Sequence, residues 1–579
     1  MMHRLLVIAN LFFLALNAEP VCAATLLVPK EFKTIQSAID AAKPGDSVLV
    51  EAGIYQERIR LSERVTLKST GDDAQGKIGL KRAETTIIDG GGNLGKGPGA
   101  VLAEGAVMDG FTVTLVGQFD QKDYDVHYAT SGENLPDERG AVGAGEDFPA
   151  LSVPGVTATV KNCIVHDNGH AGIGCSGVEG KRNASHIFKN IVYRNMGGGI
   201  GIANGATPIV EANRCYNNLR GGIGNRKSAG IILKNECFDN VRAGIGIREG
   251  ATPIVRGNKC YKNQRAGIGS RMEGTAPLIE DNDCYQNKMA GIGSRDGASP
   301  FIRNNRCYEN LLAGIGSRDG SRAIIFNNKC YQNKEAGIGS QLGARPIILR
   351  NECYENELAG IGQRSDAETF LGGNYVHHNK LAGIGFDDCM NGKSTVLNNR
   401  VIDNGLVAIG IHNGWKVRIA NNILSREGGL PPIVMVFKGA EADFAENTIT
   451  GTGVAGIRTE GKVRIVNNTF ACPSLRKGGG PPQFAVWGLP GSDITFLENT
   501  VTDWRHALSA DKSTVNASHN KISGYWQAGI RITQPVGAVV ILDNLFQTAD
   551  GQPGVNLPKD CEGLFDGNRT EVIKPAESK

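Results

Sequence analysis

Apolar and polar positions alternate in short runs along this chain, and the pattern repeats nearly always every 22 to 24 residues between Gly172 and Gly385. One period, residues 252–271, contains three short extended segments separated by turn residues: near Pro253 to Val255, near Cys260 and at Ala266 to Arg271. A unit of this size cannot bury its own core, so the pattern predicts coils that stack and cover one another. The expected fold is an all-β, right-handed parallel β-helix of 22–24-residue coils, because parallel crossovers are almost always right-handed.

The most regular element of the pattern is the tripeptide Gly-Ile-Gly, which occurs ten times. The opening glycines are Gly172, Gly199, Gly222, Gly244, Gly267, Gly291, Gly314, Gly337, Gly360 and Gly383. In the sequence Ala-Gly-Ile-Gly-Ser-Arg, strand alternation predicts Ala, Ile and Ser inward and both glycines and Arg outward. Stacked coils then give a strip of bare backbone about 45 Å long.

A row of arginines is expected beside this strip. Its members are Arg226, Arg248, Arg271, Arg295, Arg318 and Arg364, with Gln341 breaking the row. Glycine on an exposed strand often marks the close approach of a ligand, and guanidinium groups suit carboxylates, sulfates or phosphates. We therefore predict that these arginines bind an anionic polymer. The alternative is local pairing with the carboxylates that follow five of them: Glu249, Glu273, Asp296, Asp319 and Asp366.

Asparagine recurs at two turn positions of the coil. The first series is Asn190, Asn213, Asn235, Asn258, Asn282, Asn305, Asn328, Asn351 and Asn374. The second series is Asn168, Asn195, Asn218, Asn240, Asn263, Asn287, Asn310, Asn333, Asn356 and Asn379. Asparagine tolerates left-handed backbone, and its amide can bond the amide of the next coil. Both series are predicted to be structural ladders.

A Cys-Tyr pair also recurs, with cysteine expected inward and the aromatic ring outward. The cysteines are Cys215, Cys237, Cys260, Cys284, Cys307, Cys330 and Cys353. Val165, Val192 and Val376 occupy the same position in flanking coils, which favours a core role over a thiol file for a soft metal such as Cu(I). The rings are Tyr193, Tyr216, Phe238, Tyr261, Tyr285, Tyr308, Tyr331 and Tyr354. We expect them to stack on one another, with a platform for sugar rings as the alternative.

Composition adds little to this picture, since a net charge of +3 over 579 residues indicates no general affinity for nucleic acid. The N-terminus reads as a secretory signal: Arg4, an apolar stretch from Leu5 to Ala18, and Val21-Cys22-Ala23 before a cleavage site. No other segment resembles a membrane span, so a secreted or periplasmic location is expected. The expected divisions are 1–23 signal peptide, 24–117 N-terminal cap and first coils, 118–150 acidic insertion loop, 151–400 regular repeats, 401–548 irregular coils, and 549–579 terminal cap and tail.

Two segments outside the regular repeats carry further expectations. Thr34 to Ala42 reads as a short amphipathic helix with Thr34 as N-cap, which would cover the first coil. The insertion at 118–150 is rich in Asp and Glu, and we expect a solvated loop, with Ca²⁺ binding as the alternative. His166 and His170 flank Asp167 and are candidate acid and base residues, the alternative being ordinary surface side chains. No motif has confident metal-ligand spacing.

The stretch from Val28 to Ile39, followed by Val48 to Tyr55, resembles the opening of the pectin-lyase-like superfamily. The repeats resemble its carbohydrate-binding and sugar-hydrolase branch and the periplasmic NosD-type accessory proteins. The resemblance implies the β-helix fold, but that superfamily includes lyases, hydrolases, esterases, epimerases and binding proteins. The Asp-Pro-His-Asp motif of alginate epimerases and the Asn-Thr-Asp, Gly-His-Gly and Arg-Ile-Lys motifs of polygalacturonases are absent.

The sequence therefore predicts an exported β-helix that binds an extended, anionic polysaccharide along the Gly-Ile-Gly face. Whether it is an enzyme stays open; a lyase or epimerase would take its base from residues 118–176. The alternative is a non-enzymatic scaffold or metal-delivery accessory of the NosD type, which presents its surface to a protein partner.

Overall fold

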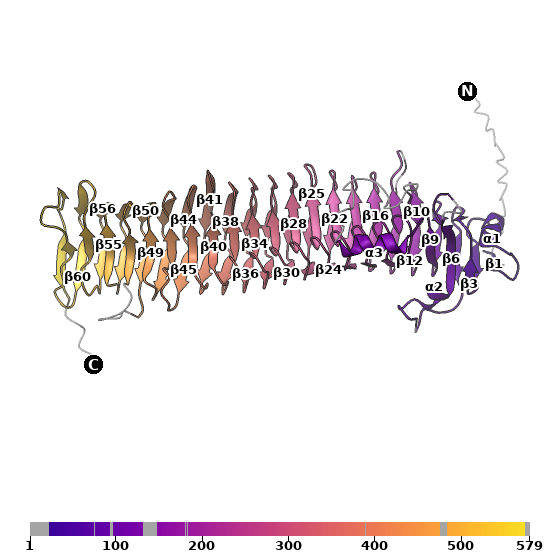
Figure 1. The fold of residues 1–579 in the computed structure, drawn as a ribbon, viewed down its shortest axis with the longest axis horizontal. Helices are drawn as coiled ribbons and strands as arrows, with labels where there is room; N and C mark the ends of the chain where they lie inside the picture. Colours follow the sequence, from indigo (N-terminus) through magenta and orange to yellow (C-terminus); the bar gives the residue numbers. More distant parts are fainter. Residues whose placement is uncertain are drawn as a thin grey trace, which may run out of the picture.

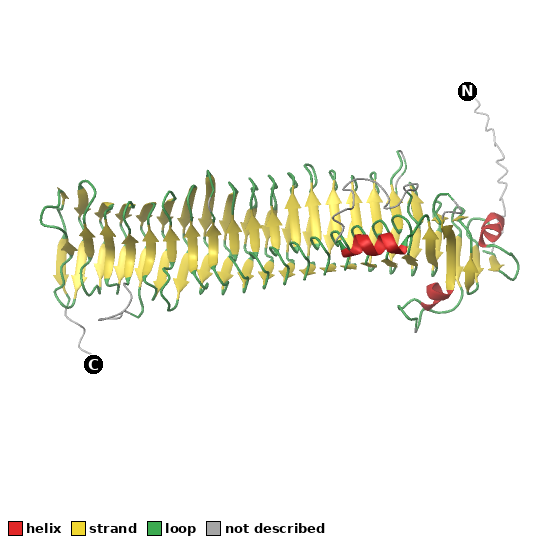
Figure 2. Ribbon diagram, viewed as in Figure 1, coloured by secondary structure: helices red, strands yellow, loops and turns green. Residues whose placement is uncertain are grey.

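The computed structural model describes residues 23–573, except residues 75, 93–95, 131–147, 180, 182, 388 and 475–482. This part of the chain forms 63 strands and three helices. The strands make three parallel sheets, here called A, B and C, which wind into one elongated stack of coils (Figures 1 and 2). The predicted right-handed parallel β-helix is confirmed. The predicted signal peptide lies almost entirely outside the described residues.

One regular coil contains one strand from each sheet. The coil that opens at residue 252 has β23 (Ile254–Arg256) in sheet A, β24 (Lys259–Tyr261) in sheet B and β25 (Ile268–Arg271) in sheet C. These strands pair in parallel with β26 (Leu278–Glu280), β27 (Asp283–Tyr285) and β28 (Ile292–Arg295) of the next coil. The three extended segments predicted for this coil are thus confirmed, and equivalent positions of the repeat face one another in register.

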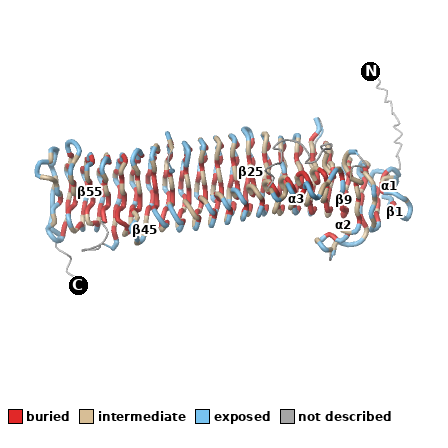
Figure 3. Tube along the Cα trace, viewed as in Figure 1, coloured by how far each residue is buried: buried red, intermediate tan, exposed pale blue. Residues whose placement is uncertain are grey.

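Inward side chains of all three sheets form one continuous core along the stack (Figure 3). Val255, Cys260 and Ile268 of the coil above are each fully buried. The two asparagine series line the corners between the sheets and are also buried. The Nδ2 of Asn287 donates to the carbonyl oxygen of Cys260 and to Oδ1 of Asn310, both at 3.0 Å, and this pattern repeats from coil to coil. The predicted structural ladders are confirmed, since they satisfy backbone groups that would otherwise be orphaned at the corners.

The N-terminal end of the stack carries β1 (Thr25–Val28), helix α1 (Ile35–Ala41) and β2 (Ser47–Val50) (Figure 1). The Thr34 side chain accepts a hydrogen bond from the backbone N–H of Ser37, as expected for an N-cap. Ile35, Ala38 and Ile39 of α1 are buried against the core. The predicted helix is confirmed; its role as the cap of the stack remains a prediction.

Two other short helices lie on the outside of the stack (Figure 2). Helix α2 (Lys81–Thr85) is anchored by buried Arg82, which pairs with Asp73 at 3.0 Å and with buried Asp109 at 2.7 Å. Helix α3 (Gln121–Ala129) occupies the start of the segment expected to be a loop, so that expectation was wrong for these residues.

The architecture continues where the Gly-Ile-Gly signature ends. Beyond residue 400 the strands keep the same three sheets and the same parallel pairing, up to β61 (Val555–Asn556), β62 (Gly563–Leu564) and β63 (Arg569–Val572). The first asparagine ladder also continues, through Asn399, Asn422, Asn447, Asn468, Asn499, Asn520 and Asn544. Within the described residues, every helix is too short or too polar to cross a membrane.

Candidate binding face

The two glycines of each Gly-Ile-Gly have different environments, contrary to the expectation that both face outward. The first glycine is buried. A Cβ placed on Gly291 would lie 2.8 Å from Nδ2 of Asn310, 2.8 Å from the carbonyl oxygen of Gly314 and 3.1 Å from Cβ of Cys307. These atoms belong to the backbone or to packed ladders, so moving them aside would cost substantial free energy of folding. The first glycine is therefore a packing residue of the fold.

The second glycine faces outward and has free space above it. A Cβ on Gly293 would meet only Cβ of Ala266, at 3.9 Å, and one on Gly246 would meet no atom within 4 Å. We call the column of these outward residues, with Gly410 of the next coil at its end, the glycine strip: Gly201, Gly224, Gly246, Gly269, Gly293, Gly316, Gly339, Gly362, Gly385 and Gly410. Gly410 is the buried end of this column. With about 4.8 Å between strands, the strip is about 43 Å long. Pro149 covers Gly174, which precedes it.

The chain itself shows that the fold does not require glycine in this column. Gly410 is followed in register by Met435, Arg458 and Trp487 in the next three coils. The backbone at the glycine strip also lacks the positive φ that would select glycine. The ten glycines are thus not explained by packing or by backbone conformation, and an exposed strand glycine without such a reason often marks close approach of a ligand.

A second column of small residues widens the bare surface. Its members lie two positions before the isoleucine of each coil: Ala243, Ala266, Ala290, Ala313, Ala336, Ala359 and Ala382. Their methyl groups lie beside the glycines of the following coil, as in the Ala266 and Gly293 pair. Sheet C therefore presents a flat face with almost no side chains across two columns.

The six predicted arginines form a row along one side of this face, and we keep the name arginine row for them. Arg226, Arg248, Arg271 and Arg295 face one another in register on adjacent strands. Ligand binding by the six arginines stays a prediction.

Local ion pairs, the alternative reading, occur at most of the row. Arg248 lies 3.4 Å from Glu249, Arg295 lies 3.4 Å from Asp296, and Arg318 lies 2.6 Å from Asp319. Glu249 is also 3.8 Å from Arg226.

Two of the expected local partners are not partners. Arg364 pairs with Asp387 at 3.3 Å, while Asp366 accepts hydrogen bonds from backbone N–H groups at residues 390 and 391. Arg271 makes no ion pair with any described residue, so Glu273 is not its partner.

The N-terminal half of the row is an environment of concentrated positive charge. Burial is the first cause that lowers the pKa of Arg248, and Arg271 is the second. Arg226 and Arg220 act in the same direction, whereas Glu249 opposes them. Cations this close favour an anion between them.

The predicted acid and base residues are engaged in structural contacts. His166 Nδ1 lies 2.8 Å from Asp167 Oδ2, and its ring stacks on Tyr193 with a centroid distance of 4.9 Å. Asp167 also accepts a hydrogen bond from Nε of Arg194 at 2.8 Å. Burial alone would raise the pKa of Asp167, but the His166 and Arg194 contacts outweigh it and hold the pKa below its ordinary value. An ionised, doubly paired carboxylate of this kind is a poor general base. His170 lies in the turn before β13 (Ile173–Ser176) of sheet C.

The cysteine and aromatic series take the expected orientations. All seven ladder cysteines are buried in the core, and burial raises the pKa of thiols such as Cys284. All twelve cysteines of the described chain are free. Neighbouring outward rings stack, for example Tyr285 on Tyr308 with a centroid distance of 4.9 Å and an interplanar angle of 6°. The expectation of self-stacking is confirmed.

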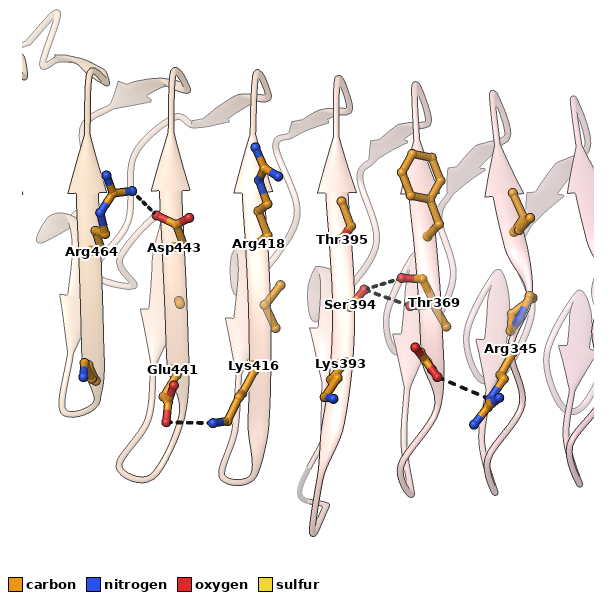
Figure 4. Close-up of a pocket in the computed structure, with 17 residues that line it drawn as sticks. Arg345, Thr369, Lys393, Ser394, Thr395, Lys416, Arg418, Glu441, Asp443 and Arg464 are labelled. Atoms are coloured by element: carbon orange, nitrogen blue, oxygen red, sulfur yellow. Dashed lines mark hydrogen bonds and ion pairs between the residues drawn. The ribbon is translucent and has the colours of Figure 1, made fainter.

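The structure shows a second surface that the sequence analysis missed, on the outer face of sheet A. An outward-facing apolar column runs along it through Ile209, Ile231, Ile254, Leu278, Phe301, Ile324, Ile347 and Phe370. Ile254 and Leu278 are half-buried, and the other six are exposed. The column ends in an open groove of about 830 Å³, which we call the sheet A groove (Figure 4). The signal was present as an apolar residue directly after each Pro of Pro208, Pro253, Pro277, Pro300 and Pro346. The sequence analysis overlooked this column. The proline of each coil faces inward, and strand alternation therefore places the apolar residue after it on the outer face.

The described residues contain no group of three or more His, Cys, Asp or Glu side chains placed to hold a metal ion. Most of the acidic insertion lies outside the described residues. Of its described acids, Asp120 caps α3 by accepting a hydrogen bond from Asp123 N–H at 2.8 Å. The Ca²⁺ alternative thus remains a prediction.

Three parallel sheets, stacked coils and a flat glycine face define a right-handed β-helix protein. The family model described as "Right handed beta helix region" matches residues 150–275, 270–388, 296–431 and 359–503. These matches together cover more than half of the chain, so the chain belongs to this family.

Solved structures with a similar fold are distant in sequence. The A-module of the Azotobacter vinelandii mannuronan C-5 epimerase AlgE4 is 16% identical, with a TM-score of 0.32, over 66% of this chain and 92% of that one. A Streptomyces thermodiastaticus GH87 α-1,3-glucanase catalytic unit is 12% identical, with a TM-score of 0.33, over 70% and 66%. Gene product 12 of bacteriophage phi29, in its pre-mature form, is 13% identical, with a TM-score of 0.37, over 94% and 72%. No curated protein sequence matches the chain.

Proposed function

We propose that this β-helix is an exported protein that binds an extended, anionic polysaccharide along the glycine strip, with the arginine row contacting its acidic groups. The observation that carries the proposal is the glycine strip itself. Ten coils in succession keep glycine at an outward position that elsewhere holds Met, Arg or Trp. A polymer of repeating units matches a surface that repeats without variation.

The charges beside the strip support an acidic rather than a neutral polymer. Arg271 has no acidic partner among the described residues, and the cations around Arg248 favour an anion. The paired arginines contribute in another way, because an arginine with its carboxylate offers both donors and acceptors to sugar hydroxyl groups.

Binding, rather than turnover, is the activity that we assign to this face. Catalysis would need an acid or base beside the strip with a suitable pKa. Among the described residues, the acids Glu249, Asp296 and Asp319 beside the strip are paired with arginines of the row. The candidate Asp167 is paired on the outside of sheet B. Lyase or epimerase activity therefore remains an outcome to be measured.

The proposal is tested by closing the strip with large side chains. The double variant Gly269→Trp/Gly293→Trp should fold, because space lies above both residues, and should bind polyuronates more weakly than the wild type because the strip is closed. Met435→Trp, which adds the same ring in the same column beyond the strip, is the matched control and should bind like the wild type. Arg271→Ala should weaken binding and reduce its dependence on salt concentration.

The measurement is affinity for uronate, sulfated and neutral polysaccharides, with ultraviolet absorbance followed to detect unsaturated lyase products. Equal binding by the double variant and by Met435→Trp would contradict the proposal. Stronger binding of neutral than of acidic polymers would still agree with binding at the glycine strip, but it would contradict the proposed role of the arginines.

A further inference from the structure

The sheet A groove is lined by charges that do not balance one another. Three acid–base pairs cross it: Arg345 with Glu368 at 3.3 Å, Lys416 with Glu441 at 3.3 Å, and Arg464 with Asp443 at 2.9 Å. Two further cations that line it, Lys393 and Arg418, make no ion pair with any described residue. Figure 4 shows them on neighbouring strands, Lys393 toward one end of the strands and Arg418 toward the other.

We propose that this groove is a second binding site, which takes an acidic sugar residue and places its carboxylate or sulfate between Lys393 and Arg418. The site lies on sheet A, whereas the glycine strip lies on sheet C. The inference therefore does not depend on the function proposed for the strip.

The strand register gives the order of the lining residues across neighbouring strands of sheet A. Thr395 of β41 (Gly392–Leu397) is in register with Arg418 of β44 (Trp415–Ala420) on one side. On the other side it is in register with Phe370 of β38 (Glu368–Gly372). Phe370 and Arg418 are thus two strand spacings apart, or about 10 Å. This span suits a ligand that has a ring over Phe370 and an anionic group at Arg418.

The floor below these side chains is fixed. Thr369 and Ser394 are buried, and their hydroxyl groups are hydrogen-bonded to each other at 2.8 Å. Ser394 also donates to the carbonyl oxygen of Thr369 at 3.2 Å. Phe370, by contrast, is 36% exposed and offers a ring face to a ligand. A rigid floor with one exposed ring and a few convergent polar groups is typical of small-ligand sites.

The mixture of charges selects the class of ligand. A polyanion such as nucleic acid would face Glu368, Glu441 and Asp443, whose carboxylates repel it. A neutral sugar would leave Lys393 and Arg418 without an anionic partner. An acidic sugar satisfies both conditions, because its hydroxyl groups can donate to the paired carboxylates while its single anionic group meets the two cations.

The experiment measures binding of a short uronate oligosaccharide, the matching neutral oligosaccharide and inorganic sulfate to the mature protein by calorimetry. The uronate compound should bind most tightly. Lys393→Ala and Arg418→Ala should each weaken it about tenfold, which is typical of losing one charge-assisted contact. Phe370→Ala should weaken the uronate and neutral compounds alike.

Lys329→Ala is the matched control, because Lys329 is an exposed lysine of sheet B paired with Glu352 at 2.8 Å and lies outside the groove. Gly269→Trp/Gly293→Trp should leave this site unchanged, which separates it from the glycine strip. The proposal is overturned if no probe binds, or if neutral and acidic oligosaccharides bind equally. It is also overturned if sulfate alone binds as tightly as the uronate compound, or if Lys393→Ala and Arg418→Ala match the control.

Discussion

At the scale of single residues, the two glycines of the repeat serve different purposes, and the same substitution should separate them. Gly291→Ala places a methyl group against Asn310 and the backbone of Gly314, so we expect destabilisation of about 3 kcal/mol. Gly293→Ala adds a methyl group in open space on ordinary strand backbone, where losing a glycine stabilises by about 0.5 kcal/mol. Urea unfolding of the two variants measures both effects, and equal destabilisation would show that both glycines are packing residues.

The cysteine ladder yields a second prediction at this scale. All seven ladder thiols are fully buried, so they should not react with a thiol reagent at pH 8 until the protein unfolds, and burial also raises the pKa of Cys284. Cys389 and Cys561, which are partly exposed, should react first. Cys284→Val should retain native stability, because Val376 fills the same slot beside Cys353. A rapid reaction of all thiols in the native protein would favour an accessible file of sulfur ligands instead.

Single residues also show which features could be predicted from the sequence and which could not. Strand alternation correctly placed Cys260, Ile268 and Arg271, since these positions depend only on period two. It failed for the first glycine because that residue lies where the chain turns from sheet B into sheet C, and alternation holds only within a strand. It also could not decide the partners of Arg364, because Asp387 belongs to the next coil.

At the scale of single elements, neighbouring strands are joined by ion pairs that predict a dependence of stability on pH. Glu280 of β26 is 2% exposed and accepts hydrogen bonds from Arg256 at 2.6 Å and from Arg303 at 2.7 Å. Burial alone would raise the pKa of Glu280, but the two guanidinium groups lower it below its ordinary value. A lowered pKa means that this stabilisation is present above the unfolded-state pKa of about 4.3 and is lost as the pH falls through the folded-state value.

Glu280→Gln should therefore lower the melting temperature at pH 7, and the difference from the wild type should shrink as the pH falls below about 4. We expect about 1 kcal/mol at pH 7, because both guanidinium groups are partly exposed to solvent. Melting curves of both proteins from pH 7 to pH 3 give the comparison. A difference that stays constant with pH would mean that the charge of Glu280 contributes nothing.

Helix α3 is an element that the sequence analysis did not predict, although a signal was present. The position after each asparagine of the second ladder is polar or exposed in several coils, but Met196, Leu219 and Val241 are buried there against Tyr124 of α3. Tyr124 Oη also donates to the carbonyl oxygen of Asn217 at 2.6 Å. Apolar residues at the same turn position of three successive coils indicate that another segment docks there, but only the structure shows which segment it is.

Leu219→Asp should release α3 from the stack without unfolding it. Leu311→Asp is the matched control, because Leu311 has the same turn position but is 50% exposed. Hydrogen exchange at residues 121–129 should become faster in the first variant and stay unchanged in the second. Arg194 also contacts α3, since its guanidinium lies 4.8 Å from the centre of the Tyr124 ring. Slow exchange in both variants would mean that the contacts of Tyr124 and Arg194 hold the helix by themselves.

At the scale of the whole molecule, the fold could be predicted from the sequence because every coil of a solenoid must meet the same packing requirements. Ten Gly-Ile-Gly triplets and two asparagine ladders repeat the same packing arrangement, and the described residues between 401 and 572 keep the architecture after the triplet is lost. The sheet A groove could not be predicted in this way. It depends on β38, β41 and β44 being longer than their predecessors and on which of their charges pair across strands.

The length of the glycine strip leads to the last prediction. If a polysaccharide lies along the whole strip, affinity should rise with the length of uronate oligosaccharides until they span about 43 Å and then level off, because further units find no glycine surface. A tryptophan in the middle of the strip, as in Gly293→Trp, divides it and should weaken long oligosaccharides far more than short ones. Gly385→Trp, near one end, leaves most of the strip open and should have a small effect on both. If binding is instead confined to the cations around Arg248, affinity should level off at short lengths and Gly385→Trp should have no effect at any length. Calorimetry over the oligosaccharide series therefore distinguishes a surface that binds the polymer along its whole length from one local anion site.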